Sequence, residues 1–109
     1  LIDAYGVECH SDDMKAELLF RERIIYSDGA ILEMTVWRVP MPVPPSRHFL
    51  KYSLFYGRPG ERIVLYDNER GKGDHRHYGP REEAYRFVSV ERLLTDFRSD
   101  VELARGETI

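Results

Sequence analysis

Two neighbouring segments of this sequence alternate between apolar and other side chains with a period of two, and three residues separate them. In residues 16–26, four apolar side chains fall on one face of an extended chain: Leu18, Phe20, Ile24 and Tyr26. Residues 30–39 alternate in the same way. The separating Ser-Asp-Gly triplet is typical of a tight turn, so the pattern predicts a β-hairpin.

The next segments extend this pattern. Four prolines in residues 40–45 exclude a central strand or a helix there and predict an extended crossing loop. Residues 49–56 and 61–66 then predict two further strands around a Gly-Arg-Pro-Gly turn, and residues 85–88 allow a short fifth strand.

The last apolar pattern has the period of a helix. After Ser89, a favourable N-cap, apolar residues recur at three- and four-residue spacing: Val90, Leu93, Leu94, Phe97 and Val101. This spacing predicts an amphipathic helix of about 15 residues. The whole pattern predicts an α+β fold, in which an antiparallel meander of four to five strands is covered on one face by the C-terminal helix.

A length of 109 residues supports one domain, which we assign to residues 14–105, with a frayed tail at 106–109. Residues 1–13 carry four acidic side chains, no lysine or arginine and no periodicity. We expect them to be a non-native or disordered leader before a start at Met14, and a short native arm is the alternative. The single cysteine, Cys9, excludes a disulfide framework and a cysteine-based zinc site.

Composition narrows the class of protein. Hydrophobic residues make up 42% and charged residues 32%, which is too apolar for a disordered chain. No apolar run approaches the roughly 20 residues of a spanning helix, so we expect no membrane association and a cytoplasmic location. The net charge of −3 argues against strong non-specific binding to long nucleic acids. Because the acidic residues gather at the termini, contact with RNA through one small basic site remains compatible with this charge.

Reactive side chains are concentrated in residues 67–79, directly after the fourth predicted strand. Two histidines, three acids, three cations, an asparagine and three glycines occur within thirteen residues. Solvated turns do not require such a run, and reactive groups concentrate in loops held by a rigid scaffold. We therefore predict a functional loop from Asp67 to His77.

The chemistry that this loop fits best is metal-independent cleavage of RNA. His75 and His77 suit the roles of general acid and base, because the imidazole pKa of about 6.5 lies near working pH. Asp74 and Asp67 are the candidates to orient an imidazole. The candidate contacts to phosphate or RNA are the remaining polar side chains: Asn68, Arg70, Lys72 and Arg76.

Two other chemistries stay open for the same loop. A metal site would use His75, His77 and an acid such as Asp74, because residues two apart share one face of a strand. Anion binding by a glycine-rich cationic loop would need no catalysis, and this version is a non-catalytic module that binds RNA, a nucleotide or a protein. We expect no cofactor.

The candidates outside the loop are weaker. We interpret His48 as an exposed histidine at a strand edge. Four aromatic residues of the predicted strands could form a platform on which RNA bases stack: Trp37, Tyr52, Tyr56 and Tyr66. Aromatic residues of a sheet more commonly belong to the core.

Several runs of this sequence resemble the TumE family of toxin components. They are KAELLFRERIIYSDGAILEMTVWRVP, KYSLFY, and YDNERGKGDHRH followed by Tyr-Arg-Phe at 85–87. The resemblance covers residue 14 to about residue 101, and its motif falls on seven residues: Asp67, Asn68, Gly73, Asp74, His75, Arg76 and His77.

This resemblance implies the toxin of a type II toxin–antitoxin pair, neutralised by direct binding of a helix-turn-helix antitoxin. The ribonuclease activity expected of such a toxin follows by analogy. RNA is the substrate that this implies, and the sequence leaves a homodimer open.

Overall fold

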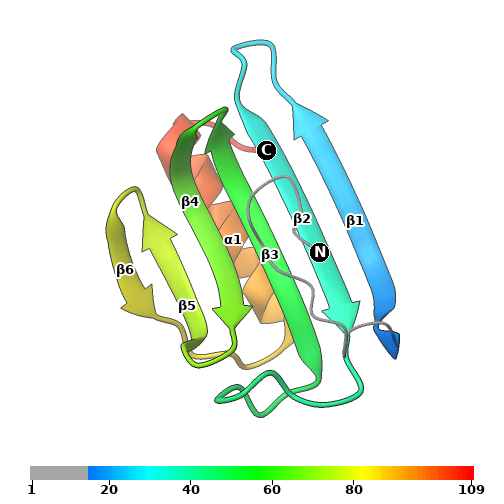
Figure 1. The fold of residues 1–109 in the computed structure, drawn as a ribbon. Coiled ribbons are helices and arrows are strands. Elements are labelled where there is room, and N and C mark those ends of the chain that lie inside the picture. The colour runs from blue at the N-terminus through cyan, green and yellow to red at the C-terminus, as the bar shows by residue number, and fades with distance from the viewer. Residues whose placement is uncertain (1–14) are drawn as a thin grey trace.

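The computed structural model describes residues 15–109, in which six strands and one helix follow one another along the chain (Figure 1). The strands are β1 (Glu17–Ile25), β2 (Ile31–Arg38), β3 (Leu50–Arg58), β4 (Glu61–Glu69), β5 (Gly73–Tyr78) and β6 (Arg81–Ala84), and the helix is α1 (Val90–Arg105). The leader predicted for residues 1–13 lies outside the described residues.

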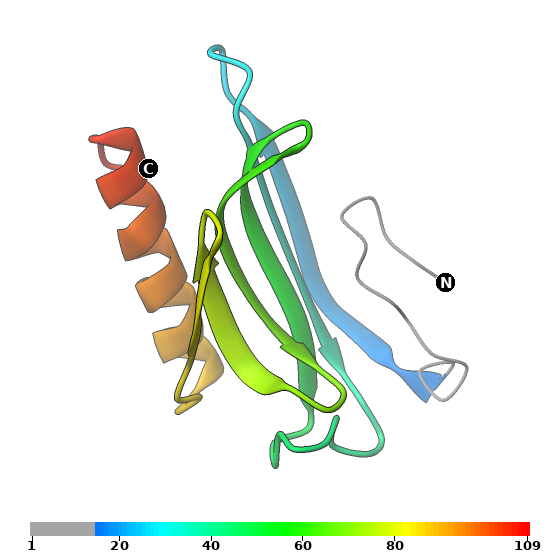
Figure 2. The same cartoon turned by 60° about the vertical axis from the view of Figure 1, so that its left-hand side comes forward.

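The six strands form one antiparallel sheet in which each strand pairs with its neighbours in sequence. Helix α1 lies along one face of this sheet (Figure 2) and contacts β4. The predicted α+β meander with a C-terminal helix is therefore confirmed. The sheet has six strands, not four or five, because residues 73–78 and 81–84 pair as strands. Residues 85–88, the suggested fifth strand, lie outside the sheet.

The core lies between the sheet and the helix. One face of β2 contributes Leu32, Met34 and Val36, each at most 1% exposed, and α1 contributes Leu93, Phe97 and Val101 at 0%. These are the residues predicted for the core by the period-two alternation of the strand and by the three- and four-residue spacing of the helix. Tyr52, Tyr56 and Tyr66 belong to the same core cluster, so they do not form an aromatic platform with Trp37 on the other face.

A β-bulge changes the face of one predicted core residue. The register between β1 and β2 shifts between Leu18 and Phe20, so that Leu18 pairs with Trp37 whereas Phe20 pairs with Val36. Because directly opposed residues share a face, Leu18 lies on the face away from α1. The prediction that all four apolar residues of this strand share a face is wrong for Leu18.

Both ends of α1 are capped, the first by Ser89 as predicted and the second by Gly106, which was assigned to the tail. The Ser89 hydroxyl accepts a hydrogen bond of 3.1 Å from the Arg92 N–H. At the other end Gly106, with φ of 74°, adopts a left-handed conformation that costs glycine little. No helix within residues 15–109 has the length and apolar character needed to cross a membrane.

The proline-rich connection between β2 and β3 has no helix or strand, as predicted, and it packs against the turn that joins β4 to β5. The Gly71 N–H donates a 2.7 Å hydrogen bond to the Pro44 carbonyl. At Gly73, an added Cβ would lie 3.1 Å from Pro45 Cγ. This proline loop, residues 39–49, therefore reaches the hairpin that carries the predicted site.

Candidate functional site

The predicted loop is wrong as a secondary-structure assignment, because residues 67–77 form most of the β4–β5 hairpin with a turn at residues 70–72. Asp67 pairs with His75 across the two strands, and Asn68 pairs with Asp74. Polar side chains suggested a loop from the sequence, but a strand accepts them when they gain partners across the sheet. The hairpin fixes the candidate residues on backbone held by a hydrogen-bonded ladder.

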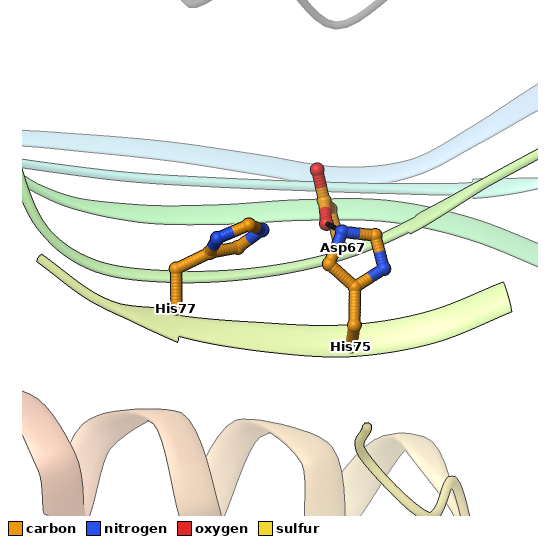
Figure 3. Close-up of side chains that lie close together, drawn as sticks. All are labelled: Asp67, His75 and His77. Atoms are coloured by element: carbon orange, nitrogen blue, oxygen red, sulfur yellow. Dashed lines mark ion pairs between the residues drawn. The ribbon is translucent and has the colours of Figure 1, made fainter. Parts of the chain in front are cut away.

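The pleat of the two strands separates the candidates onto opposite faces of the sheet. Successive side chains of a strand point to opposite faces. His75 and His77 therefore share a face with Asp67, away from α1, as Figure 3 shows. Asp74 and Arg76 project on the α1 face, where their side chains contact Tyr52 and Tyr66.

Asp67, His75 and His77 form a compact buried group, which we call the Asp-His-His cluster. One ligand atom from each residue lies within 4.8 Å of the others. The two imidazole rings are 4.9 Å apart between centroids and meet edge to face at 73°. The side chains are only 4% exposed for Asp67 and His75 and 7% for His77.

Three polar atoms of this cluster make no hydrogen bond of normal geometry within the described chain: Asp67 Oδ1, His75 Nε2 and His77 Nδ1. The first two atoms are 2.8 Å apart, which is close enough for an ion pair. The other ring nitrogen of His75, Nδ1, lies 2.9 Å from the Gly73 carbonyl oxygen, which fixes Nδ1 as the donor. Buried polar atoms nearly always find partners, so three unpartnered ones together require an explanation.

The surroundings of the two histidines shift their pKa values in opposite directions. The adjacent Asp67 carboxylate raises the pKa of His75 to about 9, against the opposing effect of burial. Burial lowers the pKa of His77, and the positive charge of Arg62 adds to this effect. In the metal-free protein near pH 7, His75 is therefore charged and His77 is neutral.

Glu82 of β6 stands at the exposed side of the cluster, and the sequence analysis missed it. Its carboxylate oxygens lie 3.8 Å from His75 Nε2 and 3.9 Å from His77 Nδ1, and its side chain is 41% exposed. The residue pairs with His77 in the ladder. The Gly-Pro dipeptide at 79–80 was the available signal, because a turn there places Glu82 beside the histidines.

Asp74 contacts a different histidine from the one we predicted. Its carboxylate lies 2.7 Å from His48 Nε2 and accepts hydrogen bonds from the hydroxyls of Ser46, at 2.5 Å, and Tyr52, at 2.7 Å. Burial raises the pKa of Asp74, but these hydrogen bonds outweigh it and the net pKa is lowered. Asp74 thus ties the proline loop to the sheet and does not contact the cluster's imidazoles.

His48 is not the exposed edge residue that we predicted. Its side chain is 17% exposed, and its ring stacks on Phe87 with centroids 3.8 Å apart. Nδ1 accepts a 3.2 Å hydrogen bond from the Leu50 N–H, so Nε2 carries the proton donated to Asp74. Because both ring nitrogens are used, this imidazole has no atom left for proton transfer.

The predicted phosphate contacts also separate in space. Asn68 is 1% exposed and joins the backbone of β3, accepting from the Tyr52 N–H and donating to the Leu50 carbonyl. Arg76, on the α1 face, donates to Glu83 at 2.6 Å. Arg70 and Lys72 are exposed in the turn beside the cluster, where Lys72 Nζ lies 3.8 Å from Glu82.

A hollow of about 580 Å³ opens on the α1 face and is lined by residues of β5, of α1 and of the segment between β6 and α1, which include Arg76, Tyr85, Arg92, Asp96 and Asp100. Its polar groups are largely satisfied. Arg92 pairs with Asp96 at 3.0 Å, and Asp100 accepts hydrogen bonds from Tyr66 and Tyr78. The unsatisfied polar atoms of the described chain lie instead in the Asp-His-His cluster, which we take as the candidate site.

Comparison with known proteins identifies the family. Searches of curated proteins and of solved structures found no match. The family model described as Toxin TumE matches residues 10–105, nearly the whole chain, including every strand and the helix. The chain therefore belongs to the TumE family and is a toxin of a toxin–antitoxin system.

Proposed function

We propose that this toxin acts by cleaving RNA, with the Asp-His-His cluster as its reactive centre. The observation that supports this proposal is the convergence of one ligand atom from each of three buried side chains on two paired strands, in a group that also holds three unpartnered polar atoms. Arrangements that leave polar atoms unsatisfied cost stability, and in native proteins they concentrate where chemistry or binding uses them.

The proposed reaction is an intramolecular transesterification. The ribose 2′-oxygen attacks the adjacent phosphorus as its proton leaves for a base, and the bond from phosphorus to the 5′-oxygen breaks as that oxygen gains a proton. The products are a 2′,3′-cyclic phosphate and a 5′-hydroxyl end. In the metal-free version expected from the sequence, His75 and His77 make the two proton transfers, and this assignment remains a prediction.

The structure supports an approach of RNA from the turn and from β6. Arg70 and Lys72 are exposed at the turn, next to the strand ends that carry Asp67 and His75. Their positive charges suit phosphate groups on either side of the scissile bond. Arg76 contacts Tyr66 on the α1 face and is left out of this proposal.

Growth arrest on induced expression is the first test. We expect His77→Ala to abolish arrest, because losing a proton-transfer group slows a reaction by about 100- to 10,000-fold. Asp67→Asn should abolish arrest too, because it removes the carboxylate that orients His75 and raises its pKa. The matched control is Asp96→Asn, the same chemical change on the α1 face, where Asp96 bonds Tyr85 and Arg92. The control should remain toxic.

Purified protein incubated with total RNA then separates cleavage from binding. Cleavage by the parent and not by folded His77→Ala supports the proposal. RNA retention without cleavage, with or without divalent ions, would favour the non-catalytic module instead. Folded cluster variants that remain as toxic as the parent would exclude the cluster as the reactive centre.

We further propose that the antitoxin is a small helix-turn-helix protein, as in a type II pair, that binds the toxin directly. Co-expression of the neighbouring small reading frame should suppress growth arrest, and the two proteins should co-purify. Suppression without a stable protein complex would contradict this part of the proposal.

A further inference from the structure

We propose that Asp67, His75 and His77 bind one divalent transition-metal ion, with Glu82 as a fourth ligand at the exposed side. The metal site stands independently of the proposed function, whereas use of the ion in RNA cleavage rests on that function. This proposal replaces the metal-independent mechanism that the sequence favoured. It also differs from the metal site considered in the sequence analysis, because the acidic ligand is Asp67 and not Asp74.

The distances fit a tetrahedral site. Zinc bonds of about 2.0–2.2 Å to nitrogen and oxygen place tetrahedral ligand atoms roughly 3.4 Å from one another. Asp67 Oδ1 and His75 Nε2 are 2.8 Å apart, and all three ligand atoms lie within 4.8 Å. The separations therefore bracket the required value.

The orientation of His75 matches that of a metal ligand. Metal-binding histidines commonly donate their second ring N–H to a carbonyl or carboxylate, which aims the other nitrogen at the ion. His75 does this with the Gly73 carbonyl, 2.9 Å from Nδ1, so Nε2 is presented to the cluster.

An ion pair without metal explains less of the geometry. A charged His75 beside Asp67 would account for their 2.8 Å approach, but this contact lacks hydrogen-bond geometry and leaves His77 Nδ1 without a partner. One cation held by an oxygen of Asp67 and by one ring nitrogen of each histidine would give Asp67 and His75 a shared partner and would use the buried His77 imidazole as well. The charge also balances, because two carboxylates, Asp67 and Glu82, would neutralise a doubly charged ion.

The ligand types indicate which metals would bind. Imidazole nitrogen with carboxylate oxygen suits zinc, iron, cobalt and manganese, whereas magnesium prefers oxygen ligands and retained water. When bound, the ion would supply positive charge for the scissile phosphate, and the exposed side near Glu82 is where a phosphate would approach.

The test is calorimetric titration of the full-length chain, stripped by a chelator, with Zn²⁺ and separately with Mg²⁺. We expect about one Zn²⁺ per chain, no comparable uptake of Mg²⁺, and a higher melting temperature with Zn²⁺. Asp67→Asn and His77→Gln should each weaken Zn²⁺ binding by more than about 100-fold, since changes even to partners of ligands cost 10- to 100-fold.

His48→Gln is the control, because it removes a histidine bonded to Asp74 outside the cluster. It should keep parental Zn²⁺ affinity. Circular dichroism confirms that each variant is folded, and Co²⁺ absorption of the parent reports the coordination directly. Absence of stoichiometric Zn²⁺ binding, or equal loss in His48→Gln and His77→Gln, would overturn the proposal.

The two proposals fail in different ways. Zn²⁺ binding without RNA cleavage would leave the metal site standing and refute the ribonuclease. RNA cleavage that persists in chelator, by protein without bound metal, would refute the use of the ion in cleavage and leave the ribonuclease standing, whereas the metal site itself is decided by the Zn²⁺ titration.

Discussion

Replacing Asp74 with alanine tests whether this carboxylate holds the proline loop to the sheet or serves the Asp-His-His cluster. The change removes the acceptor for Ser46, His48 and Tyr52. Two of these partners belong to the proline loop and the third to β3. The side chain of Asp74 is 10% exposed, so water replaces the lost contacts only in part.

The magnitude depends on what each partner does after the change. Hydrogen bonds to charged groups contribute about 1.5–3 kcal/mol, but the three contributions do not add because they share one acceptor and the partners differ in their access to water. His48 is 17% exposed and reaches water, and Ser46 Oγ still accepts a 3.5 Å hydrogen bond from Asn68 Nδ2. The Tyr52 hydroxyl belongs to a residue that is 1% exposed and is left unpaired, at a cost of about 1–3 kcal/mol.

We therefore expect Asp74→Ala to lower the free energy of unfolding by about 2–4 kcal/mol in total. For a domain of this size, such a loss lowers the melting temperature by roughly 10–25 °C. Urea unfolding followed by circular dichroism measures the free energy, and calorimetric titration of the same folded protein measures Zn²⁺ binding.

Two substitutions calibrate the result. Glu61→Ala, an exposed acid at the start of β4, should change stability by less than about 0.5 kcal/mol. Asp67→Asn should remove Zn²⁺ binding and leave the proline loop in place. A folded Asp74→Ala that loses less than about 1 kcal/mol, or that loses Zn²⁺ binding as Asp67→Asn does, would refute this account of Asp74.

Substitutions at three further positions test the packing of the sheet and helix that support the site. Gly57→Ala places a Cβ 2.1 Å from the Glu61 carbonyl oxygen, so the β3–β4 turn must shift, and we expect a loss of about 1–3 kcal/mol in urea unfolding. Because the clash is with backbone, a loss below about 0.5 kcal/mol would contradict this geometry. Ser89→Ala removes the N-cap acceptor of α1 and should cost about 1 kcal/mol, while Ser89→Asp should retain most of it. Phe97→Ala empties a fully buried position between α1 and the sheet and should cost about 3–5 kcal/mol, and a smaller loss would mean that the helix packs more loosely than described.

The core residues could be predicted from the sequence wherever one apolar periodicity continues through a whole strand or helix. In β2, alternation selected Leu32, Met34 and Val36 for the core, and in α1 the three- and four-residue spacing selected Leu93 and Phe97. Both patterns arise because one face of each element packs in the apolar core between the sheet and the helix. The bulge between Leu18 and Phe20 could not be predicted from the apolar pattern, because the position of a bulge is set by how β1 pairs with β2.

The candidate site was predictable in composition but not in arrangement. His75 and His77 were selected because two-residue spacing puts them on one face if the backbone is extended. The same alternation excludes Asp74 once residues 73–78 are a strand, because it is adjacent to His75 and points to the opposite face. The position of Asp67 beside His75 could not be predicted, since it depends on the register of β5 against β4. Glu82 could be predicted beside the histidines only by recognising β6 as a strand. The sequence of β6, Arg-Glu-Glu-Ala, is too polar to show the apolar alternation by which strands were identified.

The pairing of β4 with β5 also limits how this sequence can vary. Three residues, 70–72, join the two strands, and the identity of most of them bears little on which side chains meet. Inserting or deleting one residue there would exchange the two faces of β5, so that Asp74 and Arg76 would stand where the histidines now stand. A change of two residues would restore the arrangement. The turn is thus restricted in the parity of its length, a constraint that an aligned set of related sequences would show as gaps of even size.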